Sequence, residues 1–324
     1  MKRVILTGAT GFVGANLARR LLHDGHEVHA LVRKGYTVWR IEDLQPSLQL
    51  HEADISDASE VARVIQAVRP EWVFHLAAYG GSSWQKDERQ MVESNLVSTI
   101  HLVNACAKTG VEVLVNTGTS SEYGYKDHAP KEDDWLEPNS GYALTKASAT
   151  MYCRLRAQQD KLNIPTLRLY SAFGPYENPL RLIPTLVLSG MGGRLPPLVN
   201  PDIARDYIFM DDVVDAYLKV AAHTGSEPGA IYNIGTARQT TLREAVNIVT
   251  RVMKLTVDPR WGSMPDRDWD TSVWVSANQK AVTKLGWKPR FSFEEGFRQT
   301  VAWVESVGRN LEPYRQRTKE LAAS

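Results

Sequence analysis

The chain has 324 residues, of which 43% are hydrophobic and 23% are charged, and its formal net charge is +1. This is the composition of a globular protein with a large core, and the small net charge gives no reason to expect nucleic acid or a membrane as a partner. No apolar run reaches the ~18 residues of a membrane span, and the N-terminus enters a strand pattern without a signal-peptide pattern. Cys106 and Cys153 are too few for a disulfide framework, so a cytoplasmic location is expected.

Short apolar runs alternate with helical patterns in the first half of the chain. Apolar residues at helical spacing occupy residues 14–23 and 61–68, and Asp57 followed by Glu60 predicts the start of the second helix. The runs that predict buried strands are residues 4–6, 28–32, 72–76, 111–115 and 166–170. This alternation predicts an α/β fold with a Rossmann-type, doubly wound parallel sheet.

The pattern changes after Tyr170, where prolines and glycines become frequent. Capping-box patterns predict helix starts at Thr241 and Ser292. We expect residues 1–170 to form the sheet domain. Residues 171–324 are expected to form a smaller, mixed lid that is interleaved with the sheet domain and packs on it.

The segment between the first expected strand and the first expected helix is rich in glycine. Gly8 is suited to the tight turn, Gly11 to a close approach of the backbone to a pyrophosphate, and Gly14 to close packing of the helix on the sheet. Phe12 and Val13 begin the helix between the last two glycines. Glycines often make turns only, but the flanking strand and helix favour a dinucleotide-binding loop.

The end of the second expected strand bears on the choice of nicotinamide cofactor. An NAD-preferring site usually has an acidic residue there, whereas this chain has Arg33 and Lys34. Both side chains could hold a 2′-phosphate, so NADP(H) is favoured over NAD(H). The alternative is a solvated basic turn.

Tyr142 and Lys146 are four residues apart and would share one face of a helix. A lysine ammonium beside a phenol lowers a pKa that starts near about 10, and the tyrosine can then exchange a proton with a hydroxyl or ketone while a hydride moves. The spacing alone is weak evidence because helices carry it by chance. Residues 116–121, which are rich in hydroxyl groups, follow the expected strand at the edge where parallel sheets bind ligands.

Together these segments resemble the extended short-chain dehydrogenase/reductase family, in its branch of nucleotide-sugar epimerases, dehydratases and 4-ketoreductases. The resemblance covers nearly the whole chain and includes C-terminal signatures in residues 205–213, 232–235 and 285–289. It implies an NAD(P)-binding domain, a substrate-binding lid and a nucleotide-diphosphate sugar as the partner. A homodimer through the helices after Asp87 and Ser140 is implied as well.

The resemblance also assigns roles to residues. The catalytic residues that it implies are Thr119, Tyr142 and Lys146. The residues that it implies for cofactor binding are Gly8, Gly11, Phe12, Val13, Gly14, Arg33, Asp54, Ile55, Leu76, Ala77, Ala78, Asn95, Thr117, Tyr142, Lys146, Tyr170 and Phe173. The candidates for substrate binding are Ser120, Ser121, Ser171, Arg181, Arg205 and Arg267, the arginines for the diphosphate or, alternatively, for surface ion pairs.

Three reactions share this kind of site in the family. Dehydratases carry a carboxylate pair after the catalytic Ser or Thr, whereas Ser121 stands here at the Glu position and Glu122 comes one residue late. This pattern is closer to that of GDP-4-keto-6-deoxymannose reductases, and residues 205–218 resemble paratose and abequose synthases, which are also 4-ketoreductases. We therefore expect a 4-ketoreductase of a 4-keto-6-deoxy nucleotide-hexose, with an epimerase as the near alternative. A shift of one residue would bring Glu122 into the site, so dehydration stays open.

Two other classes of function are weighed against these enzymes. A non-catalytic NADP(H) sensor would tolerate the loss of Tyr142 or Lys146, and both are present. A reductase of a non-nucleotide ketone would lack the C-terminal signatures. No metal is expected, because the histidines at positions 23, 26 and 29 straddle a helix end and a strand and would not converge.

Overall fold

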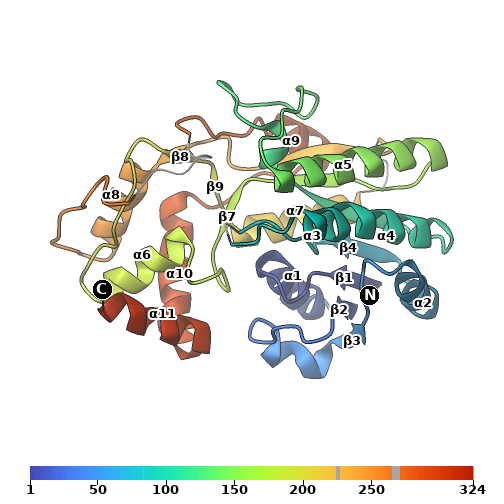
Figure 1. Ribbon diagram of the computed structural model, residues 1–324, viewed down its shortest axis with the longest axis horizontal. Helices are drawn as coiled ribbons and strands as arrows, with labels where there is room; N and C mark the ends of the chain where they lie inside the picture. Colours follow the sequence, from blue (N-terminus) through green and yellow to red (C-terminus); the bar gives the residue numbers. More distant parts are fainter. Residues whose placement is uncertain (83, 224–226, 265–270, 324) are drawn as a thin grey trace.

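The computed structural model describes residues 1–82, 84–223, 227–264 and 271–323. Seven parallel strands in this part of the chain form one sheet, in the order β10-β6-β5-β4-β1-β2-β3 (Figure 1). The strands are β1 (Arg3–Thr7), β2 (Glu27–Val32), β3 (Gln49–Glu52), β4 (Trp72–His75), β5 (Val113–Thr119), β6 (Thr166–Leu169) and β10 (Ile231–Ile234). The strand order reverses between β1 and β4, which is where such sheets bind ligands at their carboxyl edge.

The expected Rossmann-type sheet is confirmed, and it has two more strands than the sequence patterns predicted. β3 was missed because Leu50 is the one apolar residue among its four, it lies at an edge of the sheet, and none of its residues is fully buried. β10 lies after a long excursion of the chain and adds to the opposite edge, beside β6. β5 also starts later than expected and runs on to Thr119.

Helices cover both faces of the sheet (Figure 1). One core lies under α2 (Ala58–Val68), α4 (Ser98–Ala107) and α5 (Gly141–Asp160), and it includes the buried free thiols of Cys106 and Cys153. The core on the other face lies under α1 (Phe12–His23), α7 (Met210–Ala222) and α9 (Gln279–Leu285). No helix in the described part of the chain is both long enough and apolar enough to cross a bilayer.

The predicted helix starts are confirmed. Asp57 caps α2 by accepting hydrogen bonds from the N–H groups of Ser59 and Glu60, although the Glu60 carboxylate turns away to the N–H of Asp54. Complete capping boxes begin the two helices expected at Thr241 and Ser292, which are α8 (Leu242–Val252) and α10 (Phe293–Ser306). Each box satisfies backbone donors that the first helical turn leaves unpaired.

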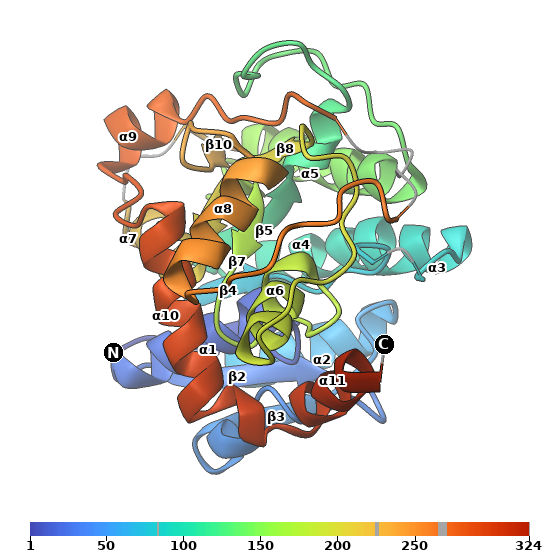
Figure 2. The same ribbon diagram turned by 90° about the vertical axis from the view of Figure 1, so that its left-hand side faces the viewer.

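A second group of elements forms a third core beside the carboxyl edge of the sheet, facing the viewer in Figure 2. Its elements are β7 (Ser171–Phe173), β8 (Ala204–Arg205), β9 (Tyr207–Phe209), β11 (Thr240–Thr241), α6 (Leu182–Met191), α8, α10 and α11 (Glu312–Ala323). β7 pairs with β9 in parallel and β8 pairs with β11 antiparallel, so this part is mixed. Because β10 and α7 return to the main sheet, the chain passes between the two parts more than once.

Short helical turns complete the described elements. They are α3 (Glu88–Met91), η1 (Glu42–Ser47), η2 (Val92–Val97), η3 (Ser120–Tyr123) and η4 (Gly308–Asn310). Of these, η2 is wound as a π-helix and η3 as a 3₁₀ turn directly after β5. Both lie next to the catalytic residues described below.

Candidate active site

The glycine-rich segment forms a cradle in which a β-carbon would have no room. Gly8 has a φ of +74°, and a β-carbon on it would lie 2.7 Å from the backbone nitrogen of Ala77. A β-carbon on Gly14 would lie 2.1 Å from the carbonyl oxygen of Gly8. Gly11 begins α1 without a side-chain cap, and Phe12 and Val13 are the first residues of the helix. An uncapped helix N-terminus with this close backbone approach fits a dinucleotide pyrophosphate.

The end of β4 is fixed beneath this cradle by a chain of side-chain hydrogen bonds. The hydroxyl of Thr7 accepts hydrogen bonds from the N–H groups of Leu76 and Ala77, at 3.1 and 3.2 Å. It also bonds Nδ1 of His75 at 2.8 Å, and Nε2 of His75 bonds the hydroxyl of Thr99 at 2.9 Å. Leu76 and Ala77, with Ala78 after them, therefore lie beside Gly8, as their assignment to the cofactor site requires. Burial lowers the pKa of His75 to about 3, so its imidazole is neutral.

The residues assigned to the adenosine end follow β2 and β3. Arg33 is exposed directly after β2. Asp54 follows β3, and one of its carboxylate oxygens accepts hydrogen bonds from the N–H and hydroxyl of Ser56. Ile55 packs on the core under α2 and α4. All three residues lie at the carboxyl ends of adjacent strands, on the same side of the sheet as the glycine cradle.

The three candidate catalytic side chains meet where β5 faces the start of α5. Thr119 ends β5, and its hydroxyl is close enough to the phenol of Tyr142, in the first turn of α5, to lower the pKa of that phenol. Lys146 lies one turn further along α5 and is 2% exposed. Gly81 forms the facing wall, since a β-carbon there would lie 3.9 Å from the Tyr142 hydroxyl oxygen. A substrate hydroxyl or ketone placed at this point would contact Thr119 and Tyr142 together.

The protonation of Tyr142 differs from the expectation. Burial raises the pKa of Tyr142 to about 12, and Glu122 acts in the same direction, whereas the nearby Thr119 hydroxyl and the charge of Arg181 lower it. Burial also lowers the pKa of Lys146. In the protein alone, desolvation of the phenol therefore outweighs the expected effect of Lys146, and the phenol is protonated at neutral pH.

Glu122 does not enter the site, which corrects the alternative that a one-residue shift would place it there. Its carboxylate accepts hydrogen bonds from the N–H of Thr119 at 2.9 Å, the hydroxyl of Thr150 at 3.0 Å and Nε of Arg168 at 2.8 Å. Its side chain is fully buried beneath η3. Both oxygens are thus used inside the protein, and no carboxylate follows Thr119 on the substrate side.

Three residues assigned to the cofactor turn out to support the site from behind. The amide of Asn95 in η2 is fully buried and bonds both backbone groups of Tyr79 and the hydroxyl of Thr145. The Thr117 hydroxyl bonds the phenol of Tyr217 at 2.6 Å. The side chain of Phe173 lies in the third core, 1% exposed, against Phe209 and Phe293, because β7 turns it away from the sheet. These contacts involve the side chains only, and the assignment of the three residues to the cofactor stays a prediction.

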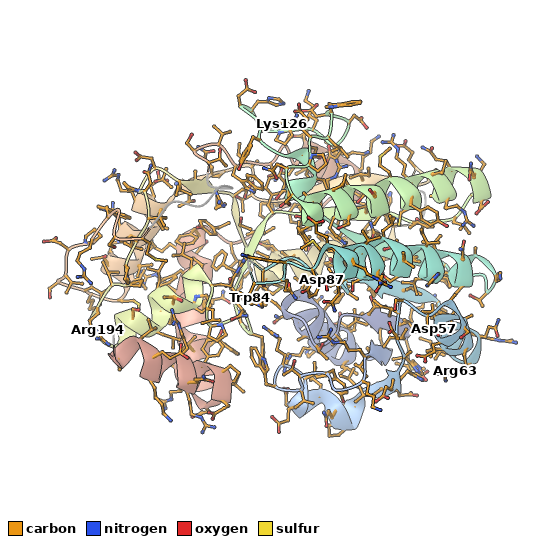
Figure 3. The ribbon with its side chains drawn as sticks, in the orientation of Figure 1. Asp57, Arg63, Trp84, Asp87, Lys126 and Arg194 are labelled. Atoms are coloured by element: carbon orange, nitrogen blue, oxygen red, sulfur yellow. The ribbon has the colours of Figure 1, made fainter. Side chains whose placement is uncertain are left out.

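The candidate substrate residues lie around the catalytic end. Ser120 and Ser121 begin η3, and Ser120 lines a small pocket with Tyr170. Ser171 begins β7, directly after Tyr170 at the same edge of the sheet. Trp84, which is 55% exposed, lies at the junction of the two parts of the molecule (Figure 3).

The three candidate arginines have different positions. Arg181 caps α6 and is close enough to Tyr142 to influence its pKa, which places it at the reacting end of the site. Arg205, in β8, lies over the ring of Trp274 in the second part. Arg267 lies outside the described residues. Among the described residues, no three His, Cys, Asp or Glu side chains gather as a metal site.

Two structural residues were not identified from the sequence. Arg40 donates to the carbonyl oxygens of Thr10 in the glycine-rich segment and of Tyr176 after β7, so it joins the two parts of the molecule. It stands in a loop without a recognisable pattern, which gives no signal. Arg168 did carry a signal, because a charge inside a run that predicts a buried strand requires a buried partner.

Comparison with known proteins identifies the family. A sequence model of the NAD dependent epimerase/dehydratase family matches residues 4–235. The UDP-glucose 4-epimerase of Mycolicibacterium smegmatis is 29% identical, with 94% of this chain and 99% of that protein aligned. A trifunctional UDP-glucose 4,6-dehydratase, 3,5-epimerase and 4-keto-L-rhamnose reductase of Arabidopsis thaliana is 27% identical over 93% of this chain, which spans only 47% of that longer protein.

Solved structures agree with the sequence comparison. A dTDP-glucose 4,6-dehydratase of Streptomyces venezuelae with NAD bound superposes with a TM-score of 0.85 and 27% identity, covering 96% of this chain and 99% of that chain. The resemblance seen in the sequence is thereby confirmed, and so is its fold. The chain belongs to the NAD-dependent epimerase/dehydratase family and is an enzyme of the extended short-chain dehydrogenase/reductase type.

Proposed function

We propose that this enzyme transfers a hydride at C4 of the hexose of a nucleotide-diphosphate sugar. The observation that carries the proposal is the proximity of the Thr119 hydroxyl to the Tyr142 phenol, beside buried Lys146 and on the same edge of the sheet as the glycine cradle. In this proposal residues 1–170 bind the dinucleotide and residues 171–324 bind the substrate. The relatives named for UDP-glucose and dTDP-glucose support the substrate class.

The chemistry of the site follows from these side chains. The bound nicotinamide supplies the hydride to the carbonyl carbon, or accepts it in the reverse direction. Tyr142 gives its phenolic proton to the carbonyl oxygen, so that the product is an alcohol, and it regains a proton from solvent. Thr119 donates a hydrogen bond to the same oxygen, and the positive charge of Lys146 stabilises the transient phenolate.

The reaction that we propose first for this site is the reduction of a 4-keto-6-deoxy nucleotide-hexose by NADPH. Dehydration needs a carboxylate beside the reacting carbon, and Glu122 is committed to Arg168, Thr150 and the Thr119 N–H. Net reduction consumes NADPH, which agrees with exposed Arg33 and Lys34 in place of an acidic residue after β2. The NAD bound in the solved dehydratase favours NAD(H) as the cofactor instead.

A 4-epimerase is the second candidate. It is favoured by the alignment with the mycobacterial UDP-glucose 4-epimerase along almost the full length of both proteins. An epimerase would keep its cofactor and return the hydride to the other face of the ketosugar. It would therefore consume no free NADPH.

The two candidates are separated by one set of assays. The purified protein is first examined for the nicotinamide absorbance band and then given NADPH with UDP- and dTDP-4-keto-6-deoxyglucose, or UDP-glucose alone. Stoichiometric NADPH consumption establishes the reductase, whereas retained cofactor with conversion of UDP-glucose to UDP-galactose establishes the epimerase. Tyr142→Phe should abolish either activity, and Tyr152→Phe, later on the same helix, should not. Activity that survives in Tyr142→Phe would overturn the proposed site.

Cofactor preference has its own test. Arg33→Ala should weaken NADPH binding by roughly tenfold, because a charge-assisted contact to the 2′-phosphate is lost, and leave NADH binding unchanged. An unmodified protein that binds NADH more tightly than NADPH would contradict the NADP(H) assignment.

For substrate binding we propose Arg181 and Arg205, together with Arg267, for the diphosphate, and Ser120, Ser121 and Ser171 for the sugar. We also propose a homodimer through α3, η2 and α5. The outer faces of these elements expose Val92, Leu144, Met151 and Leu155, each at least 43% exposed, which is an apolar stripe suited to a second copy. Light scattering of the protein and of a Leu144→Asp variant tests it, and a monomer in both samples would rule it out.

A further inference from the structure

One buried carboxylate joins β5 and α5, which carry the proposed catalytic residues, to β6. Oε1 of Glu122 accepts from the N–H of Thr119 at the end of β5, at 2.9 Å, and from the hydroxyl of Thr150 in α5, at 3.0 Å. Oε2 of the same residue accepts from Nε of Arg168 in β6, at 2.8 Å. Glu122 and Thr150 are fully buried and Arg168 is 1% exposed, so these contacts form away from solvent.

The position of Thr150 in the helix makes this contact relevant to catalysis. Thr150 is four residues beyond Lys146 and eight beyond Tyr142, so all three lie on one face of α5. The Glu122 carboxylate thus connects the backbone of Thr119 with the helix face that carries the tyrosine and the lysine. The Thr119 hydroxyl and the Tyr142 phenol therefore lie on two elements that this carboxylate joins.

The neighbouring residues leave space for the Glu122 carboxylate and supply hydrogen-bond donors to it. A β-carbon on Gly118 would lie 2.6 Å from Oε1 of Glu122, so glycine is required next to it. Thr145 and Ser148, elsewhere in α5, donate to carbonyl groups one turn back, as hydroxyls in helices commonly do. The Thr150 hydroxyl donates to Glu122 instead.

The charge of Glu122 is neutralised without help from the substrate. Arg168 pairs with it and also donates to the Tyr123 phenol at 2.7 Å and to the Glu132 carbonyl at 3.0 Å. Glu122 therefore has no free carboxylate oxygen for the substrate, and it acts on the site through the geometry that it imposes and through the charge that raises the pKa of Tyr142.

We infer that Glu122 and Thr150 are positioning residues, which hold the Thr119 hydroxyl against the Tyr142 phenol by locking the end of β5 to α5. The inference rests on the proposed function, since that function makes Thr119 and Tyr142 the reacting pair. It adds to the family site a contact that connects its two halves from behind.

Three variants test the inference. Thr150→Val keeps the shape of the side chain and removes only the donor to Glu122, whereas Thr150→Ser retains the donor. Thr300→Val in α10 is the control, because Thr300 is also fully buried and its hydroxyl donates one bond, at 2.8 Å to the Gly296 carbonyl. The two valine variants should lose similar thermal stability.

Only Thr150→Val should lose activity. We expect kcat to fall by roughly tenfold or more with KM unchanged, because a displaced reacting group slows the hydride step without weakening binding. Thr150→Ser should recover most of kcat, and Thr300→Val should retain it. Equal kcat in Thr150→Val and the unmodified enzyme, or equal loss in the two valine variants, would overturn the inference.

A spectroscopic measurement separates failure of the inference from failure of the proposed function. The protein is labelled with ¹³C at the ζ-carbon of tyrosine, and the Tyr142 resonance is assigned with Tyr142→Phe. This resonance should shift in Thr150→Val and stay in place in Thr150→Ser and Thr300→Val, because it reports the surroundings of the phenol, which include the Thr119 hydroxyl. If no nucleotide-sugar reacts but the resonance shifts as described, the proposed function fails and the positioning role holds. An unmoved resonance overturns the positioning role whatever the substrate is.

Discussion

Glu122 and Arg168 form an ion pair at 2.8 Å in which the two side chains are 0% and 1% exposed. They come from η3 and β6, and they meet directly behind Thr119. Two charges in such a place are costly to remove from water, and the cost is recovered only while both partners are present and fully hydrogen-bonded.

Glu122→Gln should therefore destabilise the protein by about 3–5 kcal/mol, because it leaves Arg168 as a buried cation without a counter-ion. Urea unfolding followed by circular dichroism measures the change. Glu294→Gln is the matched control, since Glu294 pairs with Arg298 and Arg251 at the surface of α10, and its loss should be far smaller. Equal losses in the two variants would show that the buried ion pair contributes no more to stability than the surface ion pairs do.

Sequence reasoning identified the parts of this site that depend on local pattern. Gly8 was found from the glycine spacing of the turn after the first strand. Tyr142 and Lys146 were found from their four-residue spacing on one helix face, and both patterns lie within a few residues of sequence. The side chain of Phe173 lies in the third core, and the sequence does not show which face of a three-residue strand meets which core. The direction of Glu122 depends on Arg168 and Thr150, far away in the chain, so no local pattern could give it.

The crowding at Gly8 gives a second prediction. Gly8→Ala should weaken dinucleotide binding at least about tenfold, because the new β-carbon would press on the backbone of Leu76 and Ala77 and displace the cradle. Gly110→Ala is the control, since Gly110 has a similar φ of +71° but nothing within 4 Å of an added β-carbon. Both variants carry the strain of a positive φ, and only the first should change the Kd measured by cofactor fluorescence. Similar Kd values in both would disprove a role for the close approach.

His75 predicts how stability responds to acid. Burial lowers its pKa to about 3, and Lys146 acts in the same direction, whereas an unfolded histidine titrates near about 6.5. Between these values the unfolded chain binds a proton that the native protein excludes, so stability is lost as pH falls from about 6.5 towards 3, by up to about 4 kcal/mol. Urea unfolding at a series of acidic pH values should show a shallower fall in His75→Gln. Parallel curves for the two proteins would contradict the prediction.

Glu177 predicts a dependence of the opposite sign. It is fully enclosed between Arg40, Arg181 and Tyr314, and burial raises its pKa to about 8 although both arginines act to lower it. One of its carboxylate oxygens is buried with no hydrogen-bond partner. Because the folded pKa lies above the unfolded value near about 4.3, the native protein holds the extra proton, and stability is lost as pH rises through this range to about 8.

The two groups can be told apart by pH. Below about 6.5 the falling contribution of Glu177 and the rising contribution of His75 oppose each other, so the range from about 6.5 to 8 is free of His75. Asp127 and Asp134 raise the pKa of His128, which therefore also loses its stabilising contribution as pH rises here, and Glu177→Gln keeps that contribution. The unmodified protein should lose about 1.4 kcal/mol per pH unit more than Glu177→Gln, since the amide does not titrate. Urea midpoints at intervals across this range measure the slope. If Glu177→Gln keeps the same slope, the carboxyl is ionised in the folded protein, and Arg40 and Arg181 determine its charge more strongly than burial does.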